Sequence, residues 1–409
     1  MGDLIVSIDI GTSKICAMAG RVGKNSQLDI VGKGMVQCGG IKKGIIVDIE
    51  STAAAIRAAV EEVEMSANLK VGSAYVNIHG MHVSVINNRS WLGISNGNRE
   101  ITQKDVDNVL YSVRDIDIPE DRQLIDVIPR QFIIDGYDEI IDPVGMVGTR
   151  LEVDADIIAG KITSVQNIVK SIERSDIRID GIVAEAFATG EIVLTPDEKD
   201  MGVIMLDVGG GVTDISVYHG KRLAFYDSIP VGGDHITNDI AIGLRISAAE
   251  AEKIKRQFEL ALTSLIKNDQ EITVLDINEN KKKNIKVSEV VEIIEARVYE
   301  IFSLCSAQLR KAGIDRPGGG VVLTGGGISY VDGNKQLAQE VFELPVRVAA
   351  AGQQGVTKPE YVAAAGIIRY IANIRKGGSL ATEIKIQKSR TTAPNSVFQK
   401  VVDFFRKLF

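Results

Sequence analysis

The chain has 409 residues, a length that fits two to four domains at roughly 150 residues each. Its net charge of -7 and its pI near 5.4 argue against nucleic acid as the main partner, because binding a phosphate backbone requires a basic face. Three widely separated cysteines, Cys16, Cys38 and Cys305, form no CxxC pair, which argues against a disulfide framework and a zinc site.

The first 83 residues predict a strand-rich unit with one helix. The stretch "LIVSIDIGTSKICAMAGRV" predicts two strands joined by a tight turn, and Asp9 inside its apolar run argues against a signal peptide. "STAAAIRAAVEEVEMSA" has helical spacing, with Ser51 or Thr52 as the expected N-cap. "SAYVNIHGMHVSVIN" predicts a further strand, in which His79 and His82 would face opposite sides and so would not share a metal ion.

Residues 84–162 have a different pattern, which predicts a small inserted α/β subdomain. Thr102 is expected to cap a helix over "QKDVDNVLYSVR". "RLEVDADIIAG" alternates polar and apolar residues as a half-buried strand does. We therefore expect its acidic residues to face solvent rather than to form a catalytic pair.

The second half of the chain repeats the opening pattern. "MGVIMLDVGGGVTDISVYHG" is again an apolar strand, an aspartate, a glycine-rich turn and a strand, which suggests an internal duplication. "EITVLDINENKKKNIKV" then predicts a hairpin with a lysine-rich turn, and Gly313 is expected to end a long helix. A third glycine turn, Gly325 to Gly327, follows the strand "VVLT", and "PEYVAAAGIIRYIANI" predicts a last helix with small residues on one face.

Three glycine-rich turns, each after an apolar strand, indicate a phosphate-binding site. Glycine lets backbone N–H groups approach phosphate oxygens closely. Asp9 and Asp207 end two of these strands, and carboxylates suit Mg²⁺, usually through water. The third turn has no acidic residue, so it suits the sugar and α-phosphate. The alternative, that the glycines only make hairpins, is weaker for three turns in order with "AEAFATG" between the first two.

This ordered set of motifs resembles the actin, Hsp70 and sugar-kinase ATPase superfamily over residues 1 to about 375. The motifs are "DIGTSK", "AEAFATG", "LDVGGGVTD", "GGGVVLTGGGI" and "PEYVAAAGI". Within the superfamily, "DPVGMVGTRLEVDADIIAG", "VGGDHITNDIA" and the end of the chain resemble the FtsA family of bacterial cell-division proteins. The resemblance implies an α/β, actin-like fold of two duplicated RNase H-like halves with inserted subdomains.

The resemblance also implies a division into subdomains. These are subdomain 1A (1–83 and 163–196), subdomain 1C (84–162), subdomain 2A (197–240 and 301–375, returning to 1A), subdomain 2B (241–300), a flexible linker (376–394) and an amphipathic membrane-targeting helix (395–409).

By the same resemblance, Asp9 and Asp207 would lie near Mg²⁺, and Glu185 and Asp207 would serve any hydrolysis of ATP, with Glu185 orienting water. Members of this family are nucleotide-dependent polymers first, so weak turnover is expected. The implied nucleotide-binding residues are Gly11, Thr12, Ser13, Lys14, Gly209, Gly210, Gly211, Thr213, Gly233, Glu252, Lys255, Gly325, Gly326 and Gly327.

The end of the chain, "NSVFQKVVDFFRKLF", sorts its residues on a helical wheel. Eight apolar residues share an arc of about 160°: Val397, Phe398, Val401, Val402, Phe404, Phe405, Leu408 and Phe409. Lys400, Arg406 and Lys407 are on the other side. Such a helix could dock on its own core, in a partner's groove or in a membrane interface. The preceding polar stretch of about twenty residues, with a reach of ~65 Å, and the local basic excess favour an anionic membrane.

Together these features predict an actin-like ATP-binding scaffold at the cytoplasmic face of the membrane, at the division site. The resemblance implies that it forms filaments with copies of itself, holds the C-terminal tail of FtsZ through subdomain 2B, and later contacts further division proteins. A pilus-assembly ATPase of the PilM type is the nearest alternative. A sugar kinase would need a sugar-binding cluster, and an Hsp70-like chaperone would need a peptide-binding domain after the ATPase.

Overall fold

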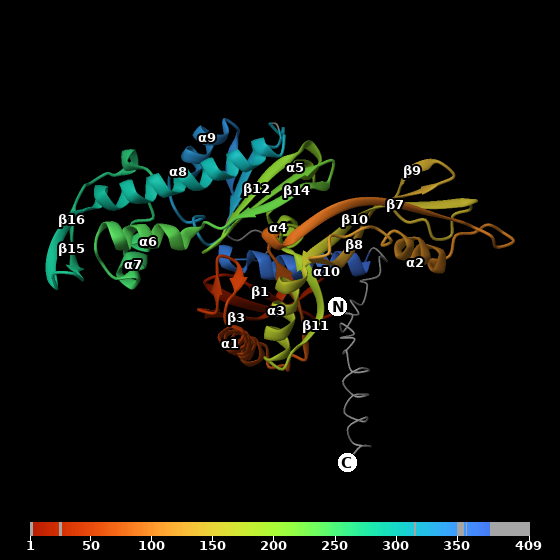
Figure 1. The fold of residues 1–409 in the computed structure, drawn as a ribbon, viewed down its shortest axis with the longest axis horizontal. Helices are drawn as coiled ribbons and strands as arrows, with labels where there is room; N and C mark the ends of the chain where they lie inside the picture. Colours follow the sequence, from red (N-terminus) through yellow and green to blue (C-terminus); the bar gives the residue numbers. More distant parts are fainter. Residues whose placement is uncertain (1–2, 24–26, 315, 350–355, 357, 377–409) are drawn as a thin grey trace, which may run out of the picture.

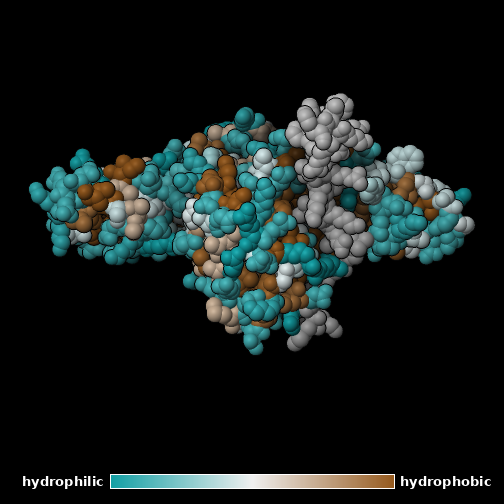
Figure 2. All heavy atoms as spheres, turned by 60° about the horizontal axis from the view of Figure 1, so that its bottom comes forward, coloured by the Kyte–Doolittle hydropathy of each residue, from teal (hydrophilic) through white to brown (hydrophobic). Residues whose placement is uncertain are grey.

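The computed structural model describes residues 3–23, 27–314, 316–349, 356 and 358–376. Lys376, the first residue of the predicted linker, still belongs to helix α10 (Val362–Lys376); the rest of that linker and the predicted membrane-targeting helix lie outside these residues. Figure 1 shows an elongated molecule whose central part carries two sheets and whose ends are formed by two arms. Figure 2 shows a mostly hydrophilic surface on which hydrophobic patches are scattered. Within the described residues, no helix is both long enough and apolar enough to cross a bilayer.

The first central sheet has five strands in the order β11-β6-β1-β2-β3. Strand β1 pairs antiparallel with β2 and parallel with β6, so the turn between β1 and β2 lies at the end of the sheet where β6 also ends. The elements of this unit are β1 (Ile5–Ile10), β2 (Lys14–Val22), β3 (Leu28–Gln37), β4 (Ile41–Lys42), β5 (Ile45–Ile46), α1 (Ile49–Ala67), β6 (Ser73–Ile78), α3 (Ile162–Glu173) and β11 (Arg178–Ala184).

The second central sheet repeats this arrangement in the order β14-β13-β12-β17-β18. Strand β12 pairs antiparallel with β13 and parallel with β17, as β1 does with β2 and β6. The predicted α/β fold with two duplicated halves is therefore confirmed. The strands are β12 (Val203–Val208), β13 (Thr213–His219), β14 (Arg222–Ile229), β17 (Val321–Thr324) and β18 (Val346–Val348).

Two helices pack between the halves, α4 (Glu185–Val193) and α10 (Val362–Lys376). They approach closely because small residues face each other: a Cβ on Gly366 would lie 2.0 Å from the carbonyl oxygen of Ala188. The predicted small-residue face of the last helix thus packs on α4. The 3₁₀ turn η4 (Pro359–Tyr361) precedes α10, and α5 (Pro196–Met201) follows α4.

One arm carries a four-stranded sheet in the order β7-β10-β8-β9. Its inner strand β10 is almost wholly buried, so the prediction that the acidic residues of this strand face solvent was wrong. Asp154 accepts a 2.7 Å hydrogen bond from Asn87, and Asp156 accepts one of 2.7 Å from Arg130, so burial is compensated by partners. The elements are β7 (Val83–Gly93), α2 (Gln103–Ser112), β8 (Arg122–Ile134), β9 (Tyr137–Ile140) and β10 (Arg150–Lys161).

The other arm is a hairpin held by helices (Figure 1). The hairpin was predicted correctly, but its lysines lie on the second strand and not in the turn, where Asn280 has a φ of 52°. Long helix α8 ends before Gly313, which has a φ of 70° and so suits glycine. The elements that form this arm or join it to the second half are α6 (Gly233–Gly243), α7 (Ala248–Phe258), η2 (Thr263–Leu265), β15 (Glu271–Asp276), β16 (Lys281–Lys286) and α8 (Val287–Lys311). Helix α9 (Asn334–Phe342) packs on β18 of the second central sheet and on α8.

Two helix starts test the capping predictions. Thr102 caps α2 in a capping box with Asp105, as expected. The cap of α1 was placed wrongly: Asp48 is the N-cap, and its carboxylate accepts a 3.0 Å hydrogen bond from the Ser51 N–H. Helix α1 therefore begins at Ile49, two residues before the predicted caps, because Asp48 is itself a strong capping residue.

Candidate functional site

A cleft of about 460 Å³ lies between the two halves and is lined by residues from both. The three glycine turns, Glu185 at the start of α4, and both predicted metal-binding aspartates border it. Residues far apart in the sequence are thus brought together at one place. The predicted residues that line the cleft are Asp9, Gly11, Thr12, Ser13, Lys14, Glu185, Asp207, Gly209, Gly210, Gly233, Glu252, Lys255, Gly325, Gly326 and Gly327.

Two predicted residues are not in this lining. Thr213 is fully buried, and its hydroxyl donates a 2.7 Å hydrogen bond to the carbonyl oxygen of Val231. Gly211 packs against the side chain of Thr12: a Cβ there would lie 2.5 Å from Thr12 Cγ2. Both residues hold the second glycine turn in place rather than bordering the cleft.

The glycine turns are packed so closely that side chains do not fit between them. A Cβ on Gly210 would lie 1.9 Å from Ser13 Oγ, in the other half. Gly327 N–H donates a 2.7 Å hydrogen bond to the carbonyl oxygen of Val208, so the second and third turns are in contact as well. At Gly325 the φ of 97° adds a backbone requirement for glycine. This packing leaves backbone groups at the surface of the cleft, as binding phosphate requires.

Buried carboxylates lie beside these turns. The amide of Asn77 donates to Asp9 Oδ1 at 2.7 Å and to Glu185 Oε2 at 2.9 Å. Burial, followed by the charge of Glu185, raises the pKa of Asp9 to about 7. Burial and the charges of Glu185, Asp214 and Asp9 raise the pKa of Asp207 well above its usual range. Such a set of oxygen donors fits a divalent cation, whose charge would offset this repulsion.

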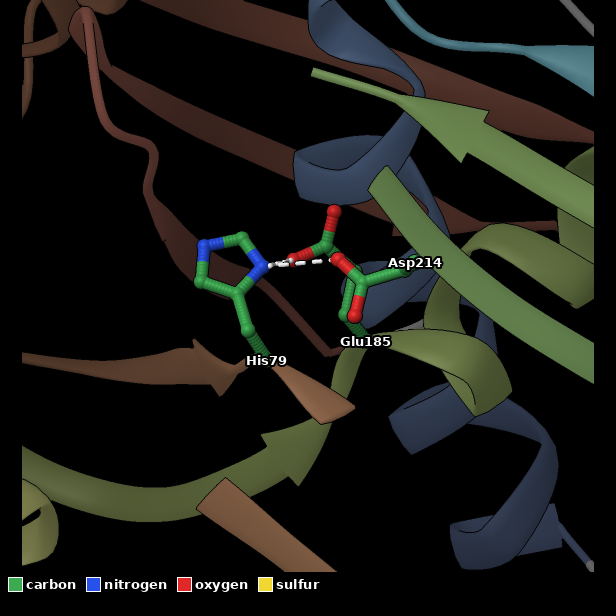
Figure 3. Close-up of side chains that lie close together, drawn as sticks. All are labelled: His79, Glu185 and Asp214. Carbon is green, nitrogen blue, oxygen red and sulfur yellow. Dashed lines mark hydrogen bonds and ion pairs between the residues drawn. The ribbon is translucent and has the colours of Figure 1, made fainter. Parts of the chain in front are cut away.

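His79 lies among these carboxylates, although the sequence predicted that it belongs to a continuous strand. Strand β6 ends at Ile78, and the 3₁₀ turn η1 (Gly80–His82) turns the ring toward the second half. His79 Nδ1 is 2.7 Å from Glu185 Oε2 and 3.0 Å from Asp214 Oδ2 (Figure 3).

These three residues could in principle hold a metal ion, because one ligand atom from each lies within 4.8 Å of the others. The potential ligands beside His79 are thus carboxylates from distant parts of the chain, whereas His82, with which it was not expected to share a metal ion, is not among them. The N···O distances are nevertheless those of hydrogen bonds, with a proton between the atoms. His82 is separate from the cluster and faces the carbonyl oxygen of Gly44 at 3.0 Å.

A second polar cluster borders the cleft on α6 and α7. The Lys255 ammonium is buried, lies 2.6 Å from Glu252 Oε2 and donates to the Thr237 hydroxyl at 2.7 Å. Burial lowers the pKa of Lys255 although the Glu252 carboxylate opposes this. The Arg256 guanidinium lies 5.3 Å from the centre of the Tyr330 ring. The predicted residues Glu252 and Lys255 thus form an ion pair, and the planar guanidinium of Arg256 lies beside it.

Several cleft residues were missed by sequence reasoning. Asn77, which bonds the carboxylates beside the cleft, is a polar residue inside the buried strand β6, and Asp214 ends the quoted motif "LDVGGGVTD", so these positions were the available signal. Asp234 lies within the quoted stretch "VGGDHITNDIA", next to Gly233, and Arg256 directly follows the predicted residue Lys255. The missed residues that line the cleft include Gln37, His79, Asp214, Asp234, Thr237, Asn238, Arg256 and Glu360.

Comparison with known proteins gives the family. Residues 204–366 match the family model "Cell division protein FtsA", and residues 80–159 match "SHS2 domain inserted in FTSA". The second match falls on the arm with the four-stranded sheet.

Curated relatives match along most of the chain. Cell division protein FtsA of Bacillus subtilis is 39% identical over 368 residues, which is 90% of this chain and 83% of that protein. Cell division protein FtsA of Escherichia coli K12 is 30% identical over 419 residues, covering 99% of this chain and 98% of that protein.

Solved structures that are less similar in sequence share the fold. A chain of the PilM–PilN type IV pilus biogenesis complex has a TM-score of 0.59 at 14% identity, covering 90% of this chain and 98% of that one. MreB 5 of Spiroplasma citri bound to AMPPNP has a TM-score of 0.54 at 14% identity, covering 91% and 97%. With relatives at 30% identity or more over nearly its whole length and an actin-like ATPase fold, the chain belongs to the FtsA family of cell-division proteins.

Proposed function

We propose that the cleft binds ATP with Mg²⁺. The observation that carries this proposal is the meeting of three glycine turns and two buried aspartates at one cleft between duplicated halves. Asp9 and Asp207 would hold Mg²⁺, which would neutralise phosphate charge and the charge of the aspartates themselves. Gly11 to Lys14 and Gly209 to Gly210 would face the phosphates, and the Glu252–Lys255 pair would face the ribose.

Hydrolysis would be slow and would depend on Glu185. This carboxylate lies at the start of α4, inside the cleft, where it could orient a water molecule toward the terminal phosphate. Its Oε2 atom is already occupied by Asn77 and His79. Bound ATP would favour the conformation that assembles into filaments of this chain.

Membrane tethering is the second part of the proposal. The helix 395–409 would lie in the interface of an anionic membrane, with its apolar residues inserted and Lys400, Arg406 and Lys407 at the headgroups. A single short helix would bind reversibly, and a filament would bind stably because it links many such helices. The filaments would hold FtsZ at the cytoplasmic face of the membrane and later recruit further division proteins.

The subdomain boundaries given above are part of this proposal. Subdomain 1C (84–162) would be the arm that contains β10, and subdomain 2B (241–300) the arm that contains the β15–β16 hairpin (Figure 1). The hairpin exposes Leu275 and Ile277, and this apolar surface would receive the tail of FtsZ.

Liposome co-sedimentation tests the tethering function. The full chain and a version ending at Ala393 are incubated with Mg²⁺ and ATP, then pelleted with anionic or neutral vesicles. We expect only the full chain to pellet, and more of it with anionic lipid. Equal pelleting of both versions, or of neither, would contradict the membrane anchor and favour a PilM-type role, for which the fold alone offers support.

A further inference from the structure

The His79 ring is surrounded by hydrogen-bond acceptors on both sides. Nδ1 faces the carboxylates of Glu185 and Asp214 at 2.7 and 3.0 Å, and Nε2 faces the carbonyl oxygen of Ile10 at 3.2 Å. A neutral imidazole donates from one nitrogen only, so it would leave its other nitrogen against an acceptor. With Glu185 and Asp214 ionised, both nitrogens of His79 donate, and this requires the protonated, charged ring.

The contacts of His79 also join the two halves of the molecule. His79 follows β6 of the first half, whereas Asp214 belongs to β13 of the second. The same turn adds two backbone contacts across the boundary: Gly80 N–H donates to Asp214 Oδ1 at 2.8 Å, and Met81 N–H donates to Ser228 Oγ at 2.9 Å. The ring therefore lies at a contact between the halves, directly beside Glu185.

We propose that His79 is a positioning residue for ATP hydrolysis, whose charged ring ties Glu185 to Asp214 and couples contact between the halves to the orientation of the Glu185 carboxylate. This inference rests on the proposed ATP-binding function. His79 and Asn77 both donate to Glu185 Oε2, and among the described residues no hydrogen bond ends at Oε1. Oε1 is the oxygen that orients water, and separation of the halves removes Asp214 and releases the ring.

The surrounding charges keep the ring protonated. Burial opposes the charged form, but the carboxylates of Glu185 and Asp214 outweigh it and raise the pKa of His79 well above its usual range. The other titratable groups nearby are Asp9 on β1, His82 on η1 and Tyr226 on β14. Around neutral pH the ring is therefore a fixed charge and not a switch.

Nitrogen NMR of the full chain tests the charge directly. The chain has only four histidines, so the ring signals of His79 can be assigned by comparison with the His79→Asn variant. In the nucleotide-free protein we expect both nitrogens of His79 to give imidazolium signals at pH 7.5. Signals of a neutral ring at pH 7.5 would overturn the proposal.

Single-turnover hydrolysis of ATP tests the positioning role. In His79→Asn we expect the rate to fall by about 10- to 100-fold while ATP affinity changes by less than about threefold, because positioning acts on the chemical step. His82→Asn is the matched control: it removes a buried histidine of the same turn that faces no carboxylate, so we expect it to lower the melting temperature and leave the rate within about twofold.

The outcomes separate the two proposals. A wild-type chain that does not bind ATP contradicts the proposed function and, with it, the positioning role, whereas the NMR signals report the ion pair between the halves separately. A wild-type chain that binds ATP and shows no turnover overturns the positioning role. Equal rates for the wild type and His79→Asn, or equal losses for both histidine variants, also overturn it.

Discussion

Ser13 Oγ donates a 2.6 Å hydrogen bond to Asp234 Oδ2, and this contact joins the first glycine turn to the start of α6 in the other half. Its partners lie in two separate motifs, and both line the cleft. The bond therefore links the two halves at the cleft, beside the turns that would hold the phosphates. A hydrogen bond to a charged group contributes about 1.5–3 kcal/mol, less where water reaches it as it does here.

Replacement of Ser13 by alanine removes this bond without changing the backbone of the turn. We expect ATP to bind about tenfold more weakly, which corresponds to about 1.4 kcal/mol. The reason is that the two halves lose one of the hydrogen bonds that hold them together at the cleft. Titration calorimetry of wild type and Ser13→Ala with Mg²⁺-ATP measures this. Unchanged or tighter binding would show that the Ser13–Asp234 contact does not support the nucleotide-bound arrangement.

Thr213 offers a contrasting prediction within the second glycine turn. Its hydroxyl bonds to the carbonyl oxygen of Val231 and does not border the cleft. Thr213→Val keeps the shape of the side chain but leaves that buried carbonyl oxygen without its partner. We expect a loss of about 1–2 kcal/mol in the free energy of unfolding, measured by denaturant titration, with ATP affinity within about twofold of wild type. A large loss of ATP affinity in a variant of normal stability would instead show that Thr213 contributes to nucleotide binding, as the sequence predicted.

The raised pKa of Asp9 predicts how stability depends on pH. In the folded chain Asp9 keeps its proton up to about pH 7, whereas in the unfolded chain the proton leaves near the usual value of 3.8. The folded state thus binds more protons between these values, so its stability falls as pH rises through this window. Asp207, whose pKa is also raised, adds to the same trend.

Thermal unfolding without nucleotide should therefore give a melting temperature about 2–5 °C lower at pH 7 than at pH 5.5. Mg²⁺-ATP should narrow this difference, because a cation offsets the charge of the aspartates. In Asp207→Asn we expect a higher melting temperature without nucleotide at pH 7 and a smaller gain from Mg²⁺-ATP. A wild-type melting temperature that rises from pH 5.5 to pH 7 would contradict the raised pKa values of Asp9 and Asp207 in the folded chain.

The sequence predicted the fold and much of the site because the signals were local. An apolar strand, an aspartate and a glycine turn follow one another directly, so the lining of the cleft by Asp9, Asp207 and the glycine turns could be expected. The His79 cluster could not be predicted, because its three members come from the turn after β6, from α4 and from β13, and they meet only when the halves pack together. Periodicity also favoured a continuous strand through His79, whereas the tertiary contacts of Gly80 with Asp214 impose a turn there.

The acidic run on β10 shows a second limit. Alternation of polar and apolar residues indicates a strand with one solvated face, and the strand itself was predicted correctly. The strand nevertheless lies at the centre of its sheet, where Arg130 and Asn87 come from the neighbouring strands β8 and β7 to bond Asp156 and Asp154. Partners on other strands, which no local pattern reveals, decide that these carboxylates are buried.

Gly325 provides the sharpest test of the packing between the glycine turns. Its φ of 97° is strained for any residue with a Cβ, and a Cβ would lie 2.4 Å from both Asp207 Oδ1 and the carbonyl oxygen of Val208. The second of these atoms belongs to the backbone and cannot move aside cheaply. We expect Gly325→Ala to reduce the free energy of unfolding by about 1–3 kcal/mol or more and to abolish measurable ATP binding.

Gly39 is the matched control for this variant, because a Cβ there meets no atom within 4 Å and its backbone is not in the left-handed region. Gly39→Ala should therefore leave both stability and ATP affinity close to those of the wild type. Denaturant titration and calorimetry of the two variants separate the general effect of replacing glycine from the specific clash with Asp207 and Val208. If Gly325→Ala bound ATP as Gly39→Ala does, the third turn would have enough freedom to shift, and its close contact with the second turn would not be a requirement of the nucleotide site.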